Sequence, residues 1–196
     1  NIIISSADIE IIERCENSLK DGFLIKHIAN YDYVLKYHTK NEKTHIKAFY
    51  HNELRRLNLK GTKSNNKFIP KEYLLGSIEQ RLDLLKGLLD TDGYVNHYKS
   101  AEYCTVSKQL ALDVRDLVNS LGGICTISEK KTKGQLAYNL LLNLPEGINP
   151  FYVSRKKNSF KKKHKYLPKR IITSIESVGE FEAQCILVDD PSHLYV

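Results

Sequence analysis

Two carboxylates and a glycine follow a run of apolar residues in the segment Gly87–Gly93, which reads GLLDTDG. An acid at the end of a buried element can cap or turn the chain, bind calcium, or take part in metal-assisted chemistry. Carboxylate oxygens are the ligands that hard divalent cations prefer. These three alternatives make different demands on the residues around Asp90 and Asp92.

The calcium alternative fails on spacing. An EF-hand loop needs ligands at positions 1, 3 and 5, a glycine at position 6 and a glutamate at position 12. Counting from Asp90, positions 5, 6 and 12 are Tyr94, Val95 and Ala101. The segment therefore does not match an EF-hand.

The capping alternative stays open, because Asp and Gly after a helix often only cap and turn the chain. Two features count against it. Negative charge at a helix C-terminus is unfavourable, and a bound cation would offset that cost. Gly87 lies in mid-helix, where glycine costs about 1 kcal/mol relative to alanine, and close approach of another helix would explain its presence.

Periodicity and capping signals predict the elements that position these acids. We expect helices over 8–19, 47–57, 77–89 and 108–121, and strands over 1–6, 23–37, 101–106, 124–128 and 137–143. Aligning Ser6 with Ser107 indicates an internal repeat of roughly 100 residues. By that register, an acid equivalent to the one in GLLDTDG would lie about nine residues before Asn1.

Composition narrows the class of protein. The 196 residues are 41% hydrophobic with a formal net charge of +7, so nucleic acid is a reasonable partner. The cysteines show no CxxC spacing, which predicts a reduced, cytoplasmic protein. Neither a membrane-spanning run nor a signal peptide is present, and no membrane partner is expected. The sequence contains no methionine, so we expect a chain that was excised, processed or recorded incompletely.

The segment Leu85–Gly93, LKGLLDTDG, resembles the LAGLIDADG motif of homing endonucleases, with Lys86 in place of the motif's alanine. Lys67–Pro70, KFIP, looks like the K-x-I-P segment that precedes the second motif in intein-borne enzymes. Residues 107–123 are similar to the helix that follows it. The resemblance implies an α+β saddle over double-stranded DNA, built of antiparallel sheets with helices on one face, in which two motif helices pack glycine to glycine.

The resemblance also implies the site residues. Asp92, rather than Asp90, would hold a catalytic Mg²⁺ (or Mn²⁺), and Lys67 and Lys156 would lie near the scissile phosphates, with Lys156 favoured over Lys157. Carboxylate-bound Mg²⁺ can both activate water and stabilise the leaving oxygen in phosphodiester hydrolysis.

DNA contacts divide into two kinds. Lys157 and Lys161, in the basic tract Arg155–Arg170, are expected to contact phosphates and to make affinity salt-sensitive. Base contacts are expected from polar side chains on the strands and their turns: Ser5, Lys36, Tyr94, Asn96, His97, Tyr103, Lys131 and Lys133.

The segment Gly179–Val196 resembles the penultimate splicing block of inteins, with Cys185 and His193 at the matching positions. A plain β-hairpin turning at Asp189–Ser192 is the alternative. We place a boundary near residues 167–168. Residues 1–167 would form an endonuclease domain without its first motif helix, and 168–196 the C-terminal strands of a hedgehog/intein (Hint) splicing domain.

This chain departs from the intein pattern at both ends. It begins with Asn1 instead of a nucleophile, and it ends at Val196 without a terminal His-Asn. We therefore expect a missing N-terminal intein segment, on the same or a separate chain, to be a partner for splicing and cleavage. Two alternatives remain: an intein fragment whose insert has decayed to DNA binding only, and a non-cutting binder of the RNA-maturase kind.

Overall fold

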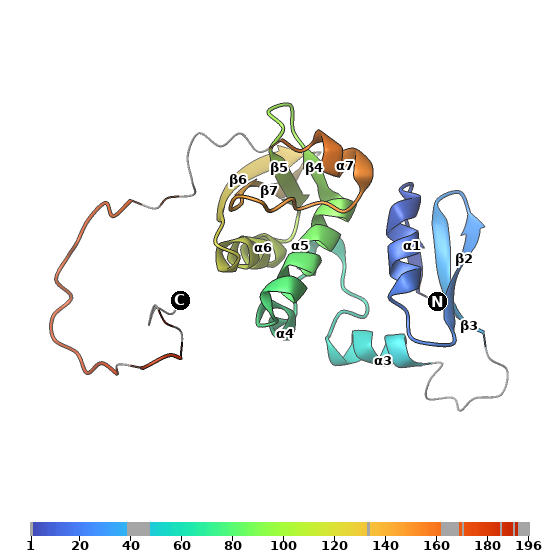
Figure 1. The fold of residues 1–196 in the computed structure, drawn as a ribbon, viewed down its shortest axis with the longest axis horizontal. Coiled ribbons are helices and arrows are strands. Elements are labelled where there is room, and N and C mark those ends of the chain that lie inside the picture. Colours follow the sequence, from blue (N-terminus) through green and yellow to red (C-terminus); the bar gives the residue numbers. More distant parts are fainter. Residues whose placement is uncertain are drawn as a thin grey trace.

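The computed structural model describes residues 2–38, 48–132, 134–161, 169, 171–184, 186–189 and 191. The N-terminal unit consists of β1 (Ile3–Ser5), α1 (Ile9–Asn17), β2 (Phe23–Ala29), β3 (Asp32–Tyr37) and α3 (Phe49–Arg56). Its three strands form an antiparallel sheet in the order β1-β3-β2, which leaves β1 at an edge (Figure 1).

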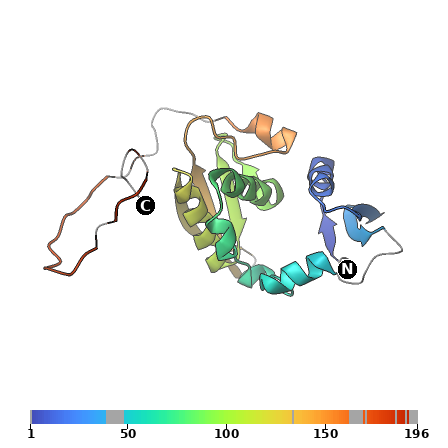
Figure 2. The same cartoon turned by 60° about the horizontal axis from the view of Figure 1, so that its bottom comes forward.

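The second unit carries the acidic segment. It contains η1 (Ser64–Asn66), α4 (Lys71–Leu74), α5 (Ile78–Asp92), β4 (Gly93–Val95), β5 (Ala101–Thr105), α6 (Lys108–Ser120), β6 (Ile124–Thr132), β7 (Gln135–Asn143) and α7 (Ser154–Ser159). The four strands form an antiparallel sheet in the order β4-β5-β7-β6. Helices α5 and α6 cover one face of this sheet (Figure 2).

The internal repeat is present, with a corrected register. The order β1-β3-β2 corresponds to β5-β7-β6, and β4 is the additional strand beside β5. The chain enters the corresponding helices, α1 and α6, through the same turn. The Asp8 amide donates to Ser6 Oγ at 3.1 Å, and the Ser107 amide donates to Thr105 Oγ1 at 3.1 Å. Asp8 thus corresponds to Ser107, two residues away from the alignment made on sequence.

Helix α5 begins where predicted and ends later. Ser77 is its N-cap. The Ser77 hydroxyl oxygen accepts a hydrogen bond from the Gln80 amide, and the Gln80 side-chain oxygen accepts one from the Ser77 amide. Its apolar side buries Leu85 and Leu89 completely in the core between helices and sheet. The helix continues through Asp92, so both acids lie in its last turn.

Four elements were not expected from sequence: η1, α4, β4 and α7. Helix α7 falls in the basic tract that was interpreted as a linker or phosphate-facing edge. It forms because its N-cap Val153 and its third residue Lys156, only 1% and 6% exposed, are both held against the body of the unit.

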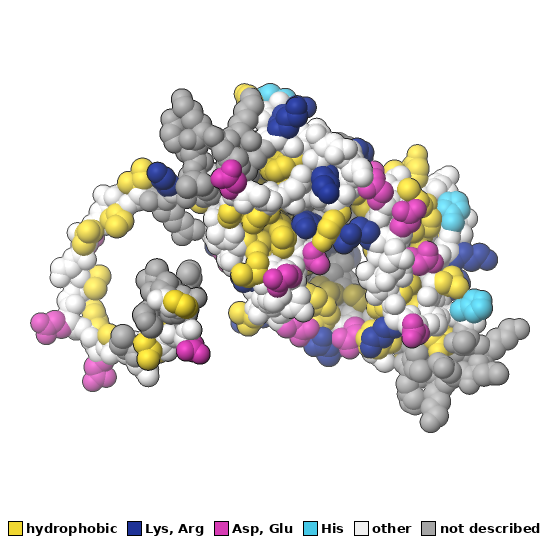
Figure 3. Space-filling model, in the orientation of Figure 1, with side chains coloured by type: hydrophobic (Ala, Val, Ile, Leu, Met, Phe, Trp, Pro, Cys, Tyr) yellow, Lys and Arg dark blue, Asp and Glu magenta, His cyan; other side chains and the backbone are white. Residues whose placement is uncertain are grey.

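The C-terminal segment leaves the body of the protein (Figure 1). The described residues from 169 onward contain neither helix nor strand, so the strands predicted for 168–196 are not confirmed. Figure 3 shows hydrophobic side chains, in yellow, along this tail. Those that are 77–89% exposed are Ile171, Ile172, Ile175, Val178, Phe181 and Leu187. Among the described residues, no helix has the length and apolar character to cross a membrane.

The two units meet through α1 and the residues around α7. Arg155 Nε and Nη2 each donate to an Asp8 carboxylate oxygen at 2.7 Å, and the Ser154 amide and hydroxyl donate to Glu10. The Arg14 guanidinium lies 3.3 Å from the centroid of the Tyr152 ring. Charged side chains of both signs gather at this junction (Figure 3).

The junction predicts a pH-dependent contribution to stability. The hydrogen bond from Arg155 lowers the pKa of Asp8, with burial opposing it. The contribution is therefore present above about pH 4 and lost as pH falls through the lowered pKa. Because Arg155 is 64% exposed, we expect at most about 1 kcal/mol. Urea denaturation of wild type and Asp8→Asn should differ at pH 7 and converge near pH 3. A difference that is constant with pH would exclude this ion pair as its cause.

Candidate functional site

Asp92 and Lys67, the predicted metal ligand and the first predicted lysine, line the same cavity. The cavity has a volume of about 340 Å³ and lies at the C-terminal end of α5, where Thr91 and the segment Phe68–Pro70 also contribute to its wall. Both charged side chains are exposed. The structure thus joins an acid and a lysine that are 25 positions apart in the sequence.

The position of Lys67 is fixed through its backbone. The Ser107 hydroxyl donates to the Lys67 carbonyl at 2.6 Å, and the Ile69 amide donates to Asp113 Oδ2 at 2.8 Å. Asp113 is buried on α6, and its other oxygen accepts from Gln109. Ser107, the N-cap of α6, and Asp113 within this helix therefore anchor the KFIP segment at the cavity beside α5.

Asp90 points away from that cavity and has a structural partner. Its carboxylate is 5% exposed and accepts from the amides of Tyr152 and Val153 at 3.0–3.2 Å. Burial raises the pKa of Asp90, while the two backbone N–H donors and Lys156 oppose that shift. This geometry favours Asp92 as the ligand.

Lys156 is also buried, at 6% exposure. Its ammonium donates to the carbonyls of Leu89, Asp90 and Gly93 at 3.0, 2.6 and 2.7 Å. Burial is the largest cause of a lowered pKa for this group. The structure therefore separates the two predicted lysines: Lys67 lies at the cavity, whereas the Lys156 ammonium is enclosed among carbonyls behind the helix end and does not line the cavity.

The residues present can contribute to a magnesium site without completing one. Within the described ranges, no group of three or more His, Cys, Asp or Glu side chains could enclose a metal. Mg²⁺ is commonly held by one or two carboxylates together with waters and substrate phosphates. A single exposed carboxylate, Asp92, fits that donor set.

The open face of the second sheet carries a hydrogen-bonded polar cluster. Glu102 accepts from the Tyr94 hydroxyl, from Asn96 Nδ2 at 2.6 Å and from Asn139 Nδ2 at 3.0 Å. Burial and the contact with Glu102 raise the pKa of Tyr94 to about 12, so its hydroxyl stays protonated. Sequence reasoning found Tyr94 and Asn96 and missed Glu102 and Asn139. Alternation along β5 places Glu102 on the face opposite Ala101 and Tyr103, which are buried.

The prediction that Tyr103 reads bases is wrong. Its side chain is 1% exposed and belongs to the core with Leu140, its cross-strand neighbour. Successive strand residues face opposite sides, so Glu102 and Cys104 take the open face that Tyr103 was expected to occupy.

The other predicted DNA contacts are mostly exposed. Ser5 and Lys36 lie on one face of the first sheet, which Lys26 shares because it pairs with Val34 between them. Lys26 was missed, although strand alternation would have shown it. His97, Lys131, Lys157 and Lys161 are exposed, and His97 stacks on Tyr98. The remaining predicted residues, Lys133, Cys185 and His193, lie outside the described residues.

Solved structures with a similar arrangement are complexes of the homing endonuclease I-DmoI. The complex with DNA and Ca gives a TM-score of 0.47 at 15% identity, covering 81% of this chain and 80% of that one. The complex with DNA and Mn gives a TM-score of 0.41 at 18% identity, covering 72% of each chain.

Comparison of the sequence identifies the family of this chain. A protein of *Mycobacterium intracellulare* named replicative DNA helicase DnaB is 35% identical over 142 residues, which cover 67% of this chain and 24% of that protein. The chain thus spans about a quarter of this relative. The model of the LAGLIDADG-like domain matches residues 79–185, from the first turn of α5 through both strands of the β6–β7 hairpin into the tail. The chain belongs to the family of LAGLIDADG-like domains.

Proposed function

We propose that this chain is part of a site-specific double-strand DNA endonuclease that hydrolyses phosphodiester bonds with Mg²⁺ (or Mn²⁺) and is embedded in a protein-splicing intein. The observation that carries the proposal is the cavity at the end of α5, which Asp92 and Lys67 line together. A carboxylate and an ammonium at the same cavity suit a phosphodiester: the carboxylate can bind its negative charge through a metal ion, and the ammonium can bind it directly.

The roles of the two residues follow from their exposure. A bound divalent cation would lower the pKa of a water and offset charge on the leaving oxygen. Asp92 supplies an exposed carboxylate, and Lys67 supplies an exposed ammonium at the same cavity. The anchored KFIP backbone holds Lys67 at the cavity, so the scissile phosphate would be oriented before the reaction.

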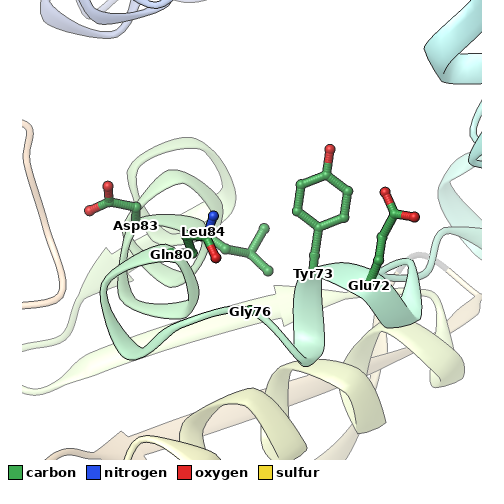
Figure 4. A pocket seen from close by; sticks show the side chains of 6 residues that line it. All are labelled: Glu72, Tyr73, Gly76, Gln80, Asp83 and Leu84. Carbon is green, nitrogen blue, oxygen red and sulfur yellow. The ribbon is translucent and has the colours of Figure 1, made fainter.

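A second motif helix would complete the site. The residues Gln80, Leu84, Gly87 and Thr91 follow helical spacing along one side of α5, and a Cβ built on Gly87 meets no atom within 4 Å. Hollows of about 510 Å³ and 340 Å³ flank this side (Figure 4 shows the first). We propose that a helix from an N-terminal intein segment, on the same or a separate chain, packs here and brings a second acid.

The DNA would lie across the open faces of the two sheets. The chain carries a net charge of +7, and these faces present Lys26 and Lys36 in the first unit and the Tyr94–Glu102–Asn139 cluster in the second. Lysines give salt-sensitive affinity, whereas polar side chains held by hydrogen bonds suit base edges.

The intein part of the proposal rests on two observations. This chain, which carries a LAGLIDADG-like domain, aligns with only about a quarter of a relative that is named as a helicase, and this is consistent with an insertion. The exposed apolar side chains of the tail need a partner, and strands of a splicing domain, with Cys185 and His193 at the splice junction, would provide one. We keep the boundary near 167–168, between α7 and the described part of the tail, as part of this proposal.

Plasmid cleavage tests the function. The substrate carries the uninterrupted host gene, and the protein is supplied alone or with the upstream segment restored, both with Mg²⁺. We expect double-strand cleavage at the insertion point only when the upstream segment is present. Salt-sensitive DNA binding without cleavage in either form would favour the alternative, a splicing element whose insert only binds DNA.

A further inference from the structure

The C-terminal end of α5 is bound from two directions by residues 152–156. The Asp90 carboxylate accepts from the amides of Tyr152 and Val153, and the Lys156 ammonium donates to the carbonyls of Leu89, Asp90 and Gly93. Both charged groups are at most 6% exposed. Each segment therefore satisfies backbone groups of the other, and we call this arrangement the helix-end clamp.

The clamp offsets the unfavourable negative charge at the C-terminal end of α5. The last carbonyls of a helix lack intrahelical partners and carry partial negative charge, to which Asp90 and Asp92 add. A lysine ammonium has three donors and no acceptor. All three donors of Lys156 have a carbonyl partner within 3.0 Å. The cation expected at this helix end is thus supplied, at least in part, by the chain itself.

The clamp fixes the main chain around Asp92, the proposed metal ligand. The carbonyls of Asp90 and Gly93, on either side of Asp92, bind the same ammonium. The main chain on both sides of Asp92 is therefore fixed, while its carboxylate stays exposed at the cavity. Lys156 reaches the site through the backbone and does not touch the cavity.

We propose, on the basis of the endonuclease function proposed above, that Lys156 is a positioning residue whose ammonium holds the main chain around Asp92 and aims this carboxylate at the phosphate next to Lys67. Residues that orient a metal ligand in this way typically change metal affinity or activity by about 10- to 100-fold when they are replaced.

The experiment uses the complete assembly, with the upstream segment present, and compares four single variants and one double variant with wild type. Lys156→Met keeps the length of the side chain and removes the charge, Lys156→Arg keeps the charge and its donors, and Asp90→Asn weakens the other arm of the clamp. Lys108→Met, at the exposed start of α6, is the matched control. Single-turnover cleavage is measured against Mg²⁺ concentration and pH, and DNA affinity is measured separately without metal.

For Lys156→Met we expect a cleavage rate about 10- to 100-fold lower or a Mg²⁺ midpoint raised by the same factor, with DNA affinity unchanged. The pH profile should keep its shape, because a positioning residue transfers no proton. Lys156→Arg should recover part of the rate, and Lys108→Met should match wild type. In the double variant Lys156→Met/Asp90→Asn, the loss should be smaller than the product of the single losses, because both residues hold one junction.

The outcomes separate the two proposals. If the wild-type assembly does not cleave, the proposed function fails and this inference with it. If wild type cleaves and Lys156→Met cleaves equally well, only the positioning role is overturned. If Lys156→Met binds DNA more weakly but cleaves at a normal rate at saturating DNA, Lys156 is a DNA contact. If Lys156→Met loses one limb of the pH profile, Lys156 has a chemical role. Either result overturns the inference. If Lys156→Met does not fold, a wild-type rate and Mg²⁺ midpoint in Asp90→Asn, which weakens the other arm of the clamp, would overturn it.

Discussion

Replacing Asp92 with asparagine is expected to reduce cleavage by at least about 10³-fold, equivalent to ~4 kcal/mol of transition-state stabilisation. The amide is nearly isosteric with the carboxylate but lacks the negative charge that holds a divalent cation. Because Asp92 is exposed, its replacement should leave the free energy of unfolding within about 0.5 kcal/mol of wild type. Single-turnover cleavage and thermal unfolding of the same preparations measure both quantities.

Asp90→Asn is the matched control, two residues away in the same helix turn. It weakens a buried acceptor of two backbone amides, so we expect a loss of stability of about 1–3 kcal/mol and a smaller loss of rate than for Asp92→Asn. If Asp92→Asn retained metal-dependent cleavage and Asp90→Asn removed it with normal stability, the assignment of the two acids would be reversed.

Replacing Gly87 with leucine is expected to have opposite effects on the isolated chain and on the assembly. In the isolated chain a side chain at this position meets open space, and removal of a mid-helix glycine should stabilise the fold by up to about 1 kcal/mol. In the assembly, the same side chain would separate the two motif helices and displace the acids from one another. Misplacement of about 1 Å can cost about 100-fold in rate, so we expect at least that loss.

Denaturation of the isolated chain and cleavage by the assembly are compared for Gly87→Ala and Gly87→Leu. The loss of cleavage should grow with the size of the side chain, while stability rises in both. Asp116→Leu, at an exposed position of α6, controls for the addition of a surface leucine and should cleave normally. Full activity in Gly87→Leu would show that no helix packs closely on this side of α5.

The motif helix and its neighbours could be predicted because their signals are local. The N-cap of α5 at Ser77, the N-cap of α6 at Ser107 and the apolar spacing of Leu85 and Leu89 all specify structure within a few residues. Asp92 and Lys67 could be paired because their motifs imply a common site, and the structure places both at one cavity.

The clamp could not be predicted, because its cause is long-range. The run SRKKNS has no apolar periodicity, and Lys156 differs from Arg155 and Lys157 only in what it meets after folding, 63–67 positions away in the sequence. The prediction that Tyr103 contacts bases was wrong for a related reason. The side of a five-residue strand that faces the core depends on its register with β4 and β7, and a shift of one residue reverses the faces.

The edge position of β1 has a consequence for how the isolated chain behaves in solution. In the second unit β4 covers the outer edge of β5, whereas the equivalent edge of β1 has no neighbouring strand within the described sheet. An uncovered edge is a template for intermolecular β-pairing. Purified alone, the chain should therefore self-associate with rising concentration, and an edge-blocking proline or a lysine pair in β1 should improve its solubility without disturbing the cavity in the other unit.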